Sequence, residues 1–257
     1  MAGRKPKEGR VSEAKAAGES GGIASLIAQM HAGVVPDTEL HANFPLFLRR
    51  QELSRILFLD EIYRQILDVP GYILEFGVRF GANLALYTNL RGVYEPYNYS
   101  RKIIGFDTFE GFAGVVDADR EQGRSSWNEG DYSVPVGHEE ILAGILRTHE
   151  AFSPLSHIEK FQLRKGDVRQ TLPQFLEDHP ETVIALAYFD MDIYAPTKEA
   201  LRLVKPRLHK GSIIVFDEFC CDYFPGETQA VLEELDLRSL RLRRHPHQPF
   251  CAWAVLE

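Results

Sequence analysis

The sequence predicts an α/β fold built on a mainly parallel sheet, and three observations support this prediction. Short apolar segments alternate with helical patterns along most of the chain. The apolar segments have the length and the β-branched or aromatic content of buried strands. Several of them end in an acidic residue, after which a helical pattern begins. Such alternation is typical of a parallel sheet that carries helices on both faces.

Helical patterns precede the sheet. The first covers Ile23–Met30, and the second, Glu52–Leu67, places apolar side chains at helical spacing until Pro70 and Gly71 end it. Segment 23–70 is therefore expected to be helical and to form a lid or an oligomer contact, and we expect a homo-oligomer. Residues 1–22 are rich in Lys, Glu, Gly and Ala, so they are expected to be a disordered tail. They lack the apolar core of a secretory signal.

Segment 71–257 is expected to form the main domain. Its expected strands are Tyr72–Phe76, Ile103–Phe106, Ile158–Leu163, Val183–Phe189, Ser212–Phe216, Leu237–Leu242 and Phe250–Leu256. Its expected helices are Gly81–Leu90, Glu139–Phe152, Val168–Glu177, Pro196–Val204 and Glu227–Leu235. The last two strands flank a turn at 245–249 and are expected to form an antiparallel hairpin. Residues 109–138 lack periodicity and carry many Gly, Asp and Ser residues, which favours a functional lid.

The composition of the chain limits the class of protein. Its 257 residues are 44% hydrophobic and 26% charged, which is ordinary for a soluble globular protein. The net charge of −8 argues against nucleic-acid binding, for which a basic surface is usual, and favours a small-molecule ligand. No apolar stretch approaches the ~18–20 residues of a membrane span. Cys220, Cys221 and Cys251 form no disulfide framework, so we expect reduced thiols in a cytoplasmic protein.

Two segments in the C-terminal third end in pairs of carboxylates. Asp190 and Asp192 follow one expected strand, and Asp217 and Glu218 follow the next. If the two strands are parallel neighbours, the four acids meet at the edge of the sheet where ligands bind in open α/β folds. Such crowding requires a positive partner or protonation, and a hard divalent cation with oxygen ligands is the simplest solution. Strand-end capping and solvated charge are the alternative.

Acids also follow the earlier strands. Glu75 ends the first strand and precedes Gly77 and Gly81, whose lack of a side chain lets a cofactor approach the backbone. Asp107 ends the second strand, where the hydroxyls of a ribose would need an acceptor, although it could also cap a helix. Asp167 follows the third strand and could reach an adenine amino group or cap the next helix. The three-glycine dinucleotide motif is absent.

Taken together, these motifs resemble the macrocin O-methyltransferase family, whose members are metal-dependent enzymes that methylate sugar hydroxyls of antibiotics. The resemblance covers about residues 72–257. It rests on E-F-G at 75–77, G-F-D-T-F-E-G-F at 105–112, K-G-D at 165–167, D-M-D-I-Y-A-P-T at 190–197 and F-D-E at 216–218. It implies a Rossmann-like class I methyltransferase fold with a seven-stranded sheet, N-terminal helices and a lid.

The resemblance also implies cofactors and roles for single residues. S-adenosylmethionine would be bound by Glu75, Gly77, Gly81, Asp107 and Asp167. The metal Mg²⁺ would be bound by Asp190, Asp217 and Glu218, where the glutamate replaces the second aspartate that is commoner in the family. Asp192 would be the general base, and the acceptor would be a glycosylated small molecule.

Other readings of the sequence remain open. A nicotinamide-dependent oxidoreductase is disfavoured by the missing third glycine and by the acid cluster. A non-catalytic domain that retains the fold is disfavoured by the two acid-bearing segments, because a binding module needs no metal ligands. In the lid, Trp127 and Tyr132 could cover the cofactor or the sugar, or could simply pack the lid closed.

Overall fold

A computed structural model of the protein describes residues 13–120, 127–246 and 248–257, and the chain divides into two compact units between Ile56 and Leu57. The N-terminal unit contains α1 (Glu13–His31), α2 (Asp37–Asn43), η1 (Phe44–Phe47) and the first residues of α3 (Arg50–Arg64). Because α1 begins at Glu13, residues 13–22 are helical and not the disordered tail that the sequence predicts. Alanine and glutamate, both strong helix formers, are frequent there.

Two further predictions for the N-terminal region concern the start of the expected tail and the oligomer contact. Residues 1–12 of the expected tail lie outside the described residues. The N-terminal unit exposes large apolar side chains, namely Ile27, Val34, Phe44, Leu46 and Leu53. Such side chains can serve as contacts between subunits, but the homo-oligomer stays a prediction.

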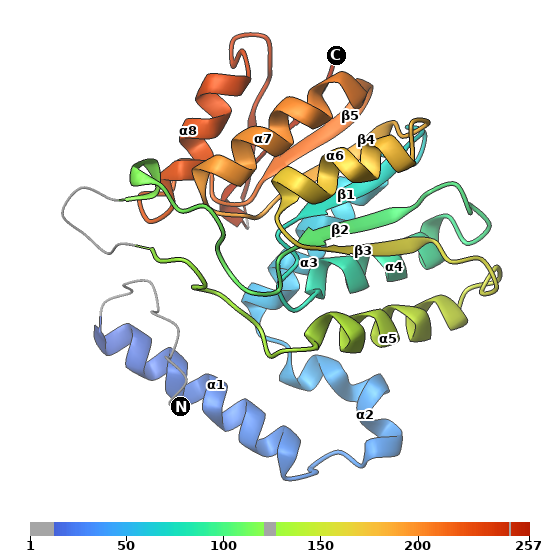
Figure 1. Cartoon of the computed structure of the whole chain (residues 1–257). Helices are drawn as coiled ribbons and strands as arrows, with labels where there is room; N and C mark the ends of the chain where they lie inside the picture. Colours follow the sequence, from blue (N-terminus) through green and yellow to red (C-terminus); the bar gives the residue numbers. More distant parts are fainter. Residues whose placement is uncertain (1–12, 121–126, 247) are drawn as a thin grey trace. The chain divides into compact units, whose positions relative to one another are not determined.

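A seven-stranded sheet forms the centre of the C-terminal unit within the described residues, as predicted (Figure 1). Its strands are β1 (Tyr72–Phe76), β2 (Ile103–Asp107), β3 (Phe161–Lys165), β4 (Ile184–Phe189), β5 (Leu208–Phe216), β6 (Arg243–His245) and β7 (Gln248–Val255). They lie in the order β3-β2-β1-β4-β5-β7-β6. The strands β1 to β5 are parallel, and β7 runs antiparallel to both β5 and β6.

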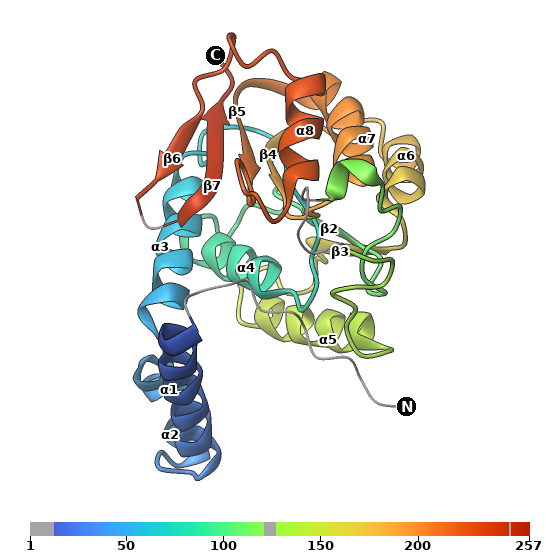
Figure 2. The same ribbon diagram turned by 90° about the vertical axis from the view of Figure 1, so that its left-hand side faces the viewer.

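Helices cover both faces of this sheet (Figures 1 and 2). They are α4 (Ala82–Tyr94), α5 (His138–Ala151), α6 (Val168–Asp178), α7 (Tyr194–Val204) and α8 (Pro225–Glu234), and short helical turns lie at η2 (Asp117–Asp119) and η3 (Lys205–Arg207). Successive residues of β4 belong to opposite cores. Tyr188 packs with α3, α4 and α5, whereas Phe189 packs with α6, α7 and α8. Burial on both faces explains the continuous apolar runs from which the sequence predicts these strands.

The structure moves some boundaries. β3 begins at Phe161, three residues after the expected start, and β6 covers Arg243–His245 instead of 237–242. The leucines at 237, 240 and 242 pack as loop residues against the core beneath α6, α7 and α8, so burial and not strand pairing explains their spacing. His245 is thus a buried strand residue and not part of a turn, and its Nε2 lies 3.1 Å from Glu61 Oε2. None of the described helices has the length and apolar character needed to cross a bilayer.

Candidate active site

The order of the strands changes direction between β1 and β4. The chain passes outward from β1 through β2 to β3 and then returns to β4 on the other side of β1. In open α/β sheets such a switch point is the usual ligand site. Backbone hydrogen bonds fix the loops at the carboxyl edge of the sheet, from Asp190 N to Phe76 O at 2.8 Å and from Asp217 N to Phe189 O at 2.9 Å.

Gly77 and Gly81 have packing reasons to be glycine. Gly77 has a φ of +89°, and a Cβ there would lie 1.8 Å from the carbonyl oxygen of Asp190. Glycine therefore lets the turn after β1 approach the backbone after β4. A Cβ at Gly81, with a φ of +88°, would lie 2.2 Å from the Leu142 side chain on α5. The predicted cofactor contacts of these glycines stay predictions, because contacts within the chain already account for both positions.

Asp107 ties the first two strand ends together. Its Oδ2 accepts hydrogen bonds from the backbone N–H groups of Val78 at 2.6 Å and Arg79 at 2.7 Å. Its Oδ1 accepts one from Phe109 N at 2.5 Å. The carboxylate therefore has a fixed orientation at the switch point, with lone pairs beyond those that the backbone uses.

Glu75 lies inside the fold beneath this turn. Its residue is 1% exposed, and its Oε1 accepts a hydrogen bond from Asn83 Nδ2 at 2.9 Å. Asn83 is on the first turn of α4, so this bond joins the end of β1 to the helix that follows. Glu75 supports the turn from below, and a direct cofactor contact stays a prediction.

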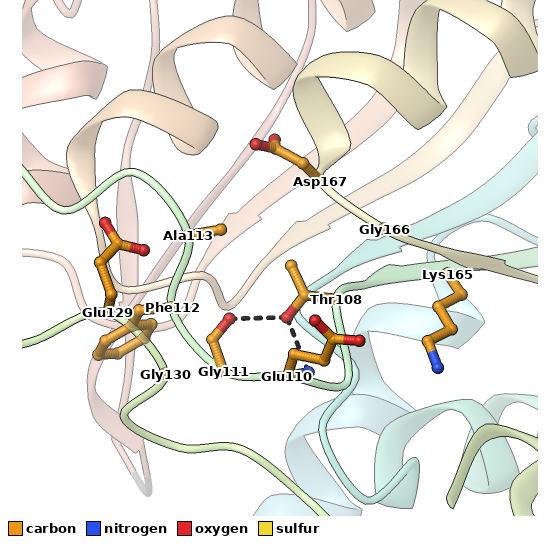
Figure 3. A pocket seen from close by; sticks show the side chains of 10 residues that line it. All are labelled: Thr108, Glu110, Gly111, Phe112, Ala113, Glu129, Gly130, Lys165, Gly166 and Asp167. Carbon is orange, nitrogen blue, oxygen red and sulfur yellow. Dashed lines mark hydrogen bonds between the residues drawn. The ribbon is translucent and has the colours of Figure 1, made fainter. Parts of the chain in front are cut away.

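A cavity of about 610 Å³ opens beside the ends of β2 and β3. Figure 3 shows its walls, which come from the loop after β2, the returning loop of the lid at Glu129 and Gly130, and the turn between β3 and α6. The lining residues are Thr108, Glu110, Gly111, Phe112, Ala113, Glu129, Gly130, Lys165, Gly166 and Asp167. The Thr108 hydroxyl donates to Gly111 O at 2.6 Å and accepts from Glu110 N at 3.1 Å, which gives the first wall a defined shape.

Asp167 lies at the mouth of this cavity and caps α6. Its Oδ1 accepts from Arg169 N at 2.9 Å, and both of its oxygens bind the Arg169 guanidinium. Burial opposes ionisation of Asp167, but the bonds from Arg169 lower its pKa below the ordinary value. The capping role that the sequence left open is therefore present, and recognition of an adenine stays a prediction.

The acids after β4 and β5 lie close enough to influence one another. Asp217 Oδ1 accepts hydrogen bonds from the Tyr188 hydroxyl and, at 3.2 Å, from the Cys251 thiol. Burial raises the pKa of Asp192 well above its ordinary value, the charges of Glu218 and Asp217 raise it further, and Arg79 opposes them. The structure thus brings Asp192, Asp217 and Glu218 together, as the strand-end pattern predicts.

Glu227, in the first turn of α8, is an acid of this cluster that the sequence analysis did not identify. It is 0% exposed, and its Oε1 accepts a hydrogen bond from Glu218 N at 3.0 Å. Burial raises its pKa well above the ordinary value, and the charges of Asp192, Asp217 and Glu218 add to this effect. Its place in a helical pattern gave no sign of this position, because an acid is ordinary in the first turn of a helix.

The described side chains do not form an assembled metal site. Within residues 13–120, 127–246 and 248–257, no group of three His, Cys, Asp or Glu side chains is arranged to hold a metal ion. Asp217 is oriented by Tyr188 and Cys251, while Glu227 is oriented by the backbone of Glu218. The roles predicted for Asp190, Asp217 and Glu218 therefore stay predictions.

The lid is fastened to the edge of the sheet on both sides of residues 121–126, which lie outside the described residues. Asp119 is buried, and its Oδ1 accepts a hydrogen bond from Tyr194 N at the start of α7 at 2.6 Å. Trp127 stacks on Phe224 with ring centroids 4.6 Å apart, and its Nε1 donates to Tyr223 O at 2.6 Å.

Tyr132 reaches from the lid toward the acids. Burial and the nearby charge of Asp192 raise the pKa of Tyr132, so its hydroxyl stays protonated near neutral pH. The Arg79 guanidinium lies over its ring, 4.8 Å from the centroid. Trp127 therefore packs the lid closed, which is one of the two roles that the sequence left open. The role of covering the cofactor or the sugar stays a prediction for both residues.

Backbone conformation marks the same region. In the described chain, left-handed φ values at non-glycine residues occur in the loops at this edge and in the lid, at Arg79, Phe109, Tyr132, Asp192 and Cys220. Such conformations cost free energy and tend to cluster at functional sites. The strained loops, the acids and the cavity identify this edge as the candidate active site.

Comparisons with known proteins identify the family of the chain. A family model described as macrocin-O-methyltransferase matches residues 52–233. The crystal structure of CalS11, described as a calicheamicin methyltransferase, is 42% identical in sequence with a TM-score of 0.90, over 97% of this chain and 98% of that one. An apo structure of CalS11, described as a TDP-rhamnose 3'-O-methyltransferase, is 41% identical with a TM-score of 0.83, over 96% of each chain. The sequence motifs of this chain also resemble a rhamnose O-methyltransferase of the calicheamicin pathway in particular, and these two matches confirm that narrower resemblance.

A curated relative is more distant. The mycinamicin III 3''-O-methyltransferase of Micromonospora griseorubida is 28% identical over 65% of this chain. The match spans 61% of the length of that relative, which is less than two thirds.

Proposed function

Because the chain belongs to the macrocin-O-methyltransferase family, we propose that it transfers a methyl group from S-adenosylmethionine to a sugar hydroxyl in an antibiotic pathway. The observation that carries this proposal is the pairing of two features at one sheet edge. A cavity of about 610 Å³ lies at the ends of β2 and β3, and an acid cluster lies at the ends of β4 and β5. The cavity suits the nucleoside part of the cofactor. The acid cluster suits a cation and the sugar hydroxyl, which must lose its proton.

The cofactor would lie across the switch point. Its adenosine part suits the cavity, whose walls include a threonine, two glycines of the lid loop and the turn that Asp167 caps. Asp107, held by backbone N–H groups beside this cavity, would accept hydrogen bonds from the ribose hydroxyls. Gly77, in the turn after β1, would contact the methionine part, and the bound cofactor would supply the methyl group.

We predict that Asp107→Ala weakens S-adenosylmethionine binding by about 1.5–3 kcal/mol, the scale of hydrogen bonds to a charged group. Titration calorimetry measures this directly. The substitution also removes an acceptor from Val78, Arg79 and Phe109, so thermal unfolding must be recorded in parallel. Asp107→Asn, which keeps one acceptor oxygen, is the matched control and should lose less affinity. Unchanged affinity in the folded Ala variant would remove Asp107 from the site.

The donors of the acid cluster fit a hard divalent cation. They are carboxylate oxygens, which Mg²⁺ and Mn²⁺ prefer, and one of them, Glu227 Oε2, is buried without a hydrogen-bond partner among the described residues. Asp190, Asp217 and Glu218 would hold the ion after their side chains rotate. When bound, the ion would lower the pKa of the acceptor hydroxyl.

Asp192 is proposed to accept the proton from the sugar hydroxyl. A free alcohol is too weakly acidic to be an effective nucleophile at neutral pH, and a carboxylate with a raised pKa is a better proton acceptor than an ordinary one. The backbone of Asp192 is left-handed, with φ 64°, so the chain departs from the extended strand conformation at this residue. Tyr132 and Trp127 on the lid would exclude water from the reacting atoms.

The sugar that accepts the methyl group could be attached either to a nucleotide or to a natural product, and the two forms can be compared as substrates. The high identity to CalS11 over nearly the whole chain favours a nucleotide-linked deoxysugar, whereas the mycinamicin relative favours a glycosylated natural product. We predict that TDP-rhamnose is methylated with a kcat/KM at least about tenfold above that of any glycosylated antibiotic in a panel, a difference of roughly 1.4 kcal/mol. Labelled S-adenosylmethionine with mass spectrometry of the products measures both.

Each outcome of this panel has a distinct meaning. Faster methylation of a glycosylated antibiotic would overturn the nucleotide-sugar preference but support sugar methylation. Calorimetric binding of NAD, with none of S-adenosylhomocysteine, would replace methyl transfer by the oxidoreductase alternative.

A further inference from the structure

Glu227 is buried in a way that ordinary packing does not explain. It belongs to the first turn of α8 and is 0% exposed. Its Oε1 accepts from Glu218 N at 3.0 Å, but its Oε2 is fully buried and has no hydrogen-bond partner among the described residues. Buried polar atoms are nearly always paired, so an unpaired carboxylate oxygen calls for a ligand.

Protonation of Glu227 does not remove this difficulty. A neutral carboxyl group would carry its proton on an oxygen, and the hydroxyl on Oε2 would be as unpaired as the charged oxygen. The partial positive charge at the start of α8 favours an acid there, but it supplies no partner for Oε2. Either protonation state leaves a buried polar atom unsatisfied, which costs free energy.

The neighbours of Glu227 share its sign. The carboxylates of Asp192, Asp217 and Glu218 all act on it electrostatically. Acids elsewhere on α8 have cationic partners, since Glu233 lies 2.5 Å from Lys198 Nζ and Glu234 lies 2.9 Å from Lys205 Nζ. A positive ligand among the acids would give Glu227 the kind of partner that these two residues already have.

The position of Glu227 is fixed by its surroundings. At Gly226, a Cβ would lie 2.0 Å from Asp119 Oδ1 and 2.6 Å from Tyr194 N, so only glycine lets the start of α8 come this close to the lid and α7. The Glu227 carboxylate therefore stays against the backbone that carries Asp217 and Glu218.

We propose that Glu227 is a further carboxylate of the divalent-cation site, and that its Oε2 contributes to holding the cation. This inference rests on the cation dependence of the proposed function. It extends that site from the loops after β4 and β5 to the first turn of α8. Glu227 thereby has two tasks, because Oε1 orients the Glu218 backbone and Oε2 faces the ion.

The test measures Mn²⁺ binding to the full-length protein with saturating S-adenosylhomocysteine, by titration calorimetry and by the free-Mn²⁺ signal in electron paramagnetic resonance. Glu227→Gln keeps the size of the side chain and an oxygen for the Glu218 N–H, but it removes the charge. The expected result is a 10- to 100-fold weaker affinity for Mn²⁺, the range found when residues that support a metal site are changed. Glu233→Gln makes the same chemical change on the outer side of the same helix and should leave the affinity unchanged.

The outcomes separate this inference from the function on which it rests. Wild-type affinity in folded Glu227→Gln would overturn the role of Glu227 while leaving the cation site in place. No Mn²⁺ binding by the wild-type protein would overturn the cation dependence itself. Circular dichroism and thermal unfolding verify folding. If Glu227→Gln does not fold, Glu227→Asp replaces it, because it keeps the charge but shortens the reach. Weaker Mn²⁺ binding by that variant supports the proposal, and unchanged binding overturns it.

Discussion

Asp192→Asn should lower kcat by about 10²–10⁴-fold, the usual contribution of a general base. Asparagine is nearly isosteric with aspartate and tolerates the left-handed φ of 64° at this position, so the loop should keep its shape. The variant lacks a carboxylate that can take the proton from the sugar hydroxyl. Steady-state kinetics with S-adenosylmethionine and the accepted sugar measure the effect, and Mn²⁺ affinity should be nearly unchanged.

Asp190→Asn is the matched comparison. It makes the same chemical change two residues earlier, at the residue that directly follows β4 and is assigned to the cation. This variant should bind Mn²⁺ more weakly and should recover part of its activity in excess Mg²⁺. If excess Mg²⁺ rescues the variant at 192 and not the one at 190, the roles of base and metal ligand are the reverse of those assigned here.

Removal of divalent cations should abolish methyl transfer, and Mg²⁺ or Mn²⁺ should restore it. The reason is that a sugar hydroxyl is a weak acid. A bound cation would stabilise the negative charge that develops on its oxygen by several kcal/mol. Dialysis against EDTA, followed by assays with and without added ions, measures the loss and the return. Ca²⁺ offers the same charge with a larger and more flexible coordination sphere and is the informative third ion.

Cofactor binding provides the control for this experiment. The cavity at the ends of β2 and β3 contains none of the acids assigned to the cation, so calorimetry should find S-adenosylhomocysteine bound equally well before and after chelation. Retained binding shows that the chelated protein is folded. Full activity in a sample freed of divalent ions would exclude the cation-assisted mechanism.

The centre of the sheet could be predicted from the sequence because strands such as β1 and β4 are buried on both faces. Runs such as Ile184–Phe189 are apolar throughout, and acids mark where each run leaves the core. The carboxyl ends of neighbouring parallel strands lie at the same edge of a sheet, so the sequence alone predicts that Asp192, Asp217 and Glu218 lie close together. The weak hairpin was harder to place, because Leu240 and Leu242 are partly buried against the core without being in a strand.

Other parts of the site depend on contacts between distant residues, which local patterns do not record. Asp119 and Tyr194 are far apart in the sequence, as are Cys251 and Asp217, yet each pair is joined by a hydrogen bond. Glu227 falls at a helical position where an acid is ordinary, and only its complete burial distinguishes it. In contrast, Gly77 was rightly singled out, but its packing against Asp190 is a reason that a turn motif alone does not reveal.

The stacking of Trp127 on Phe224 has a thermodynamic consequence. Phe224 immediately precedes α8, whose first turn carries Glu227, so the lid contacts the short segment that also carries the proposed ion ligand. If the acceptor presses the lid against Phe224, it changes the affinity for the ion. By linkage, the ion must then change the affinity for the acceptor by the same factor. Heterotropic cooperativity between sugar and cation would follow from a single aromatic stack, without any displacement of the sheet.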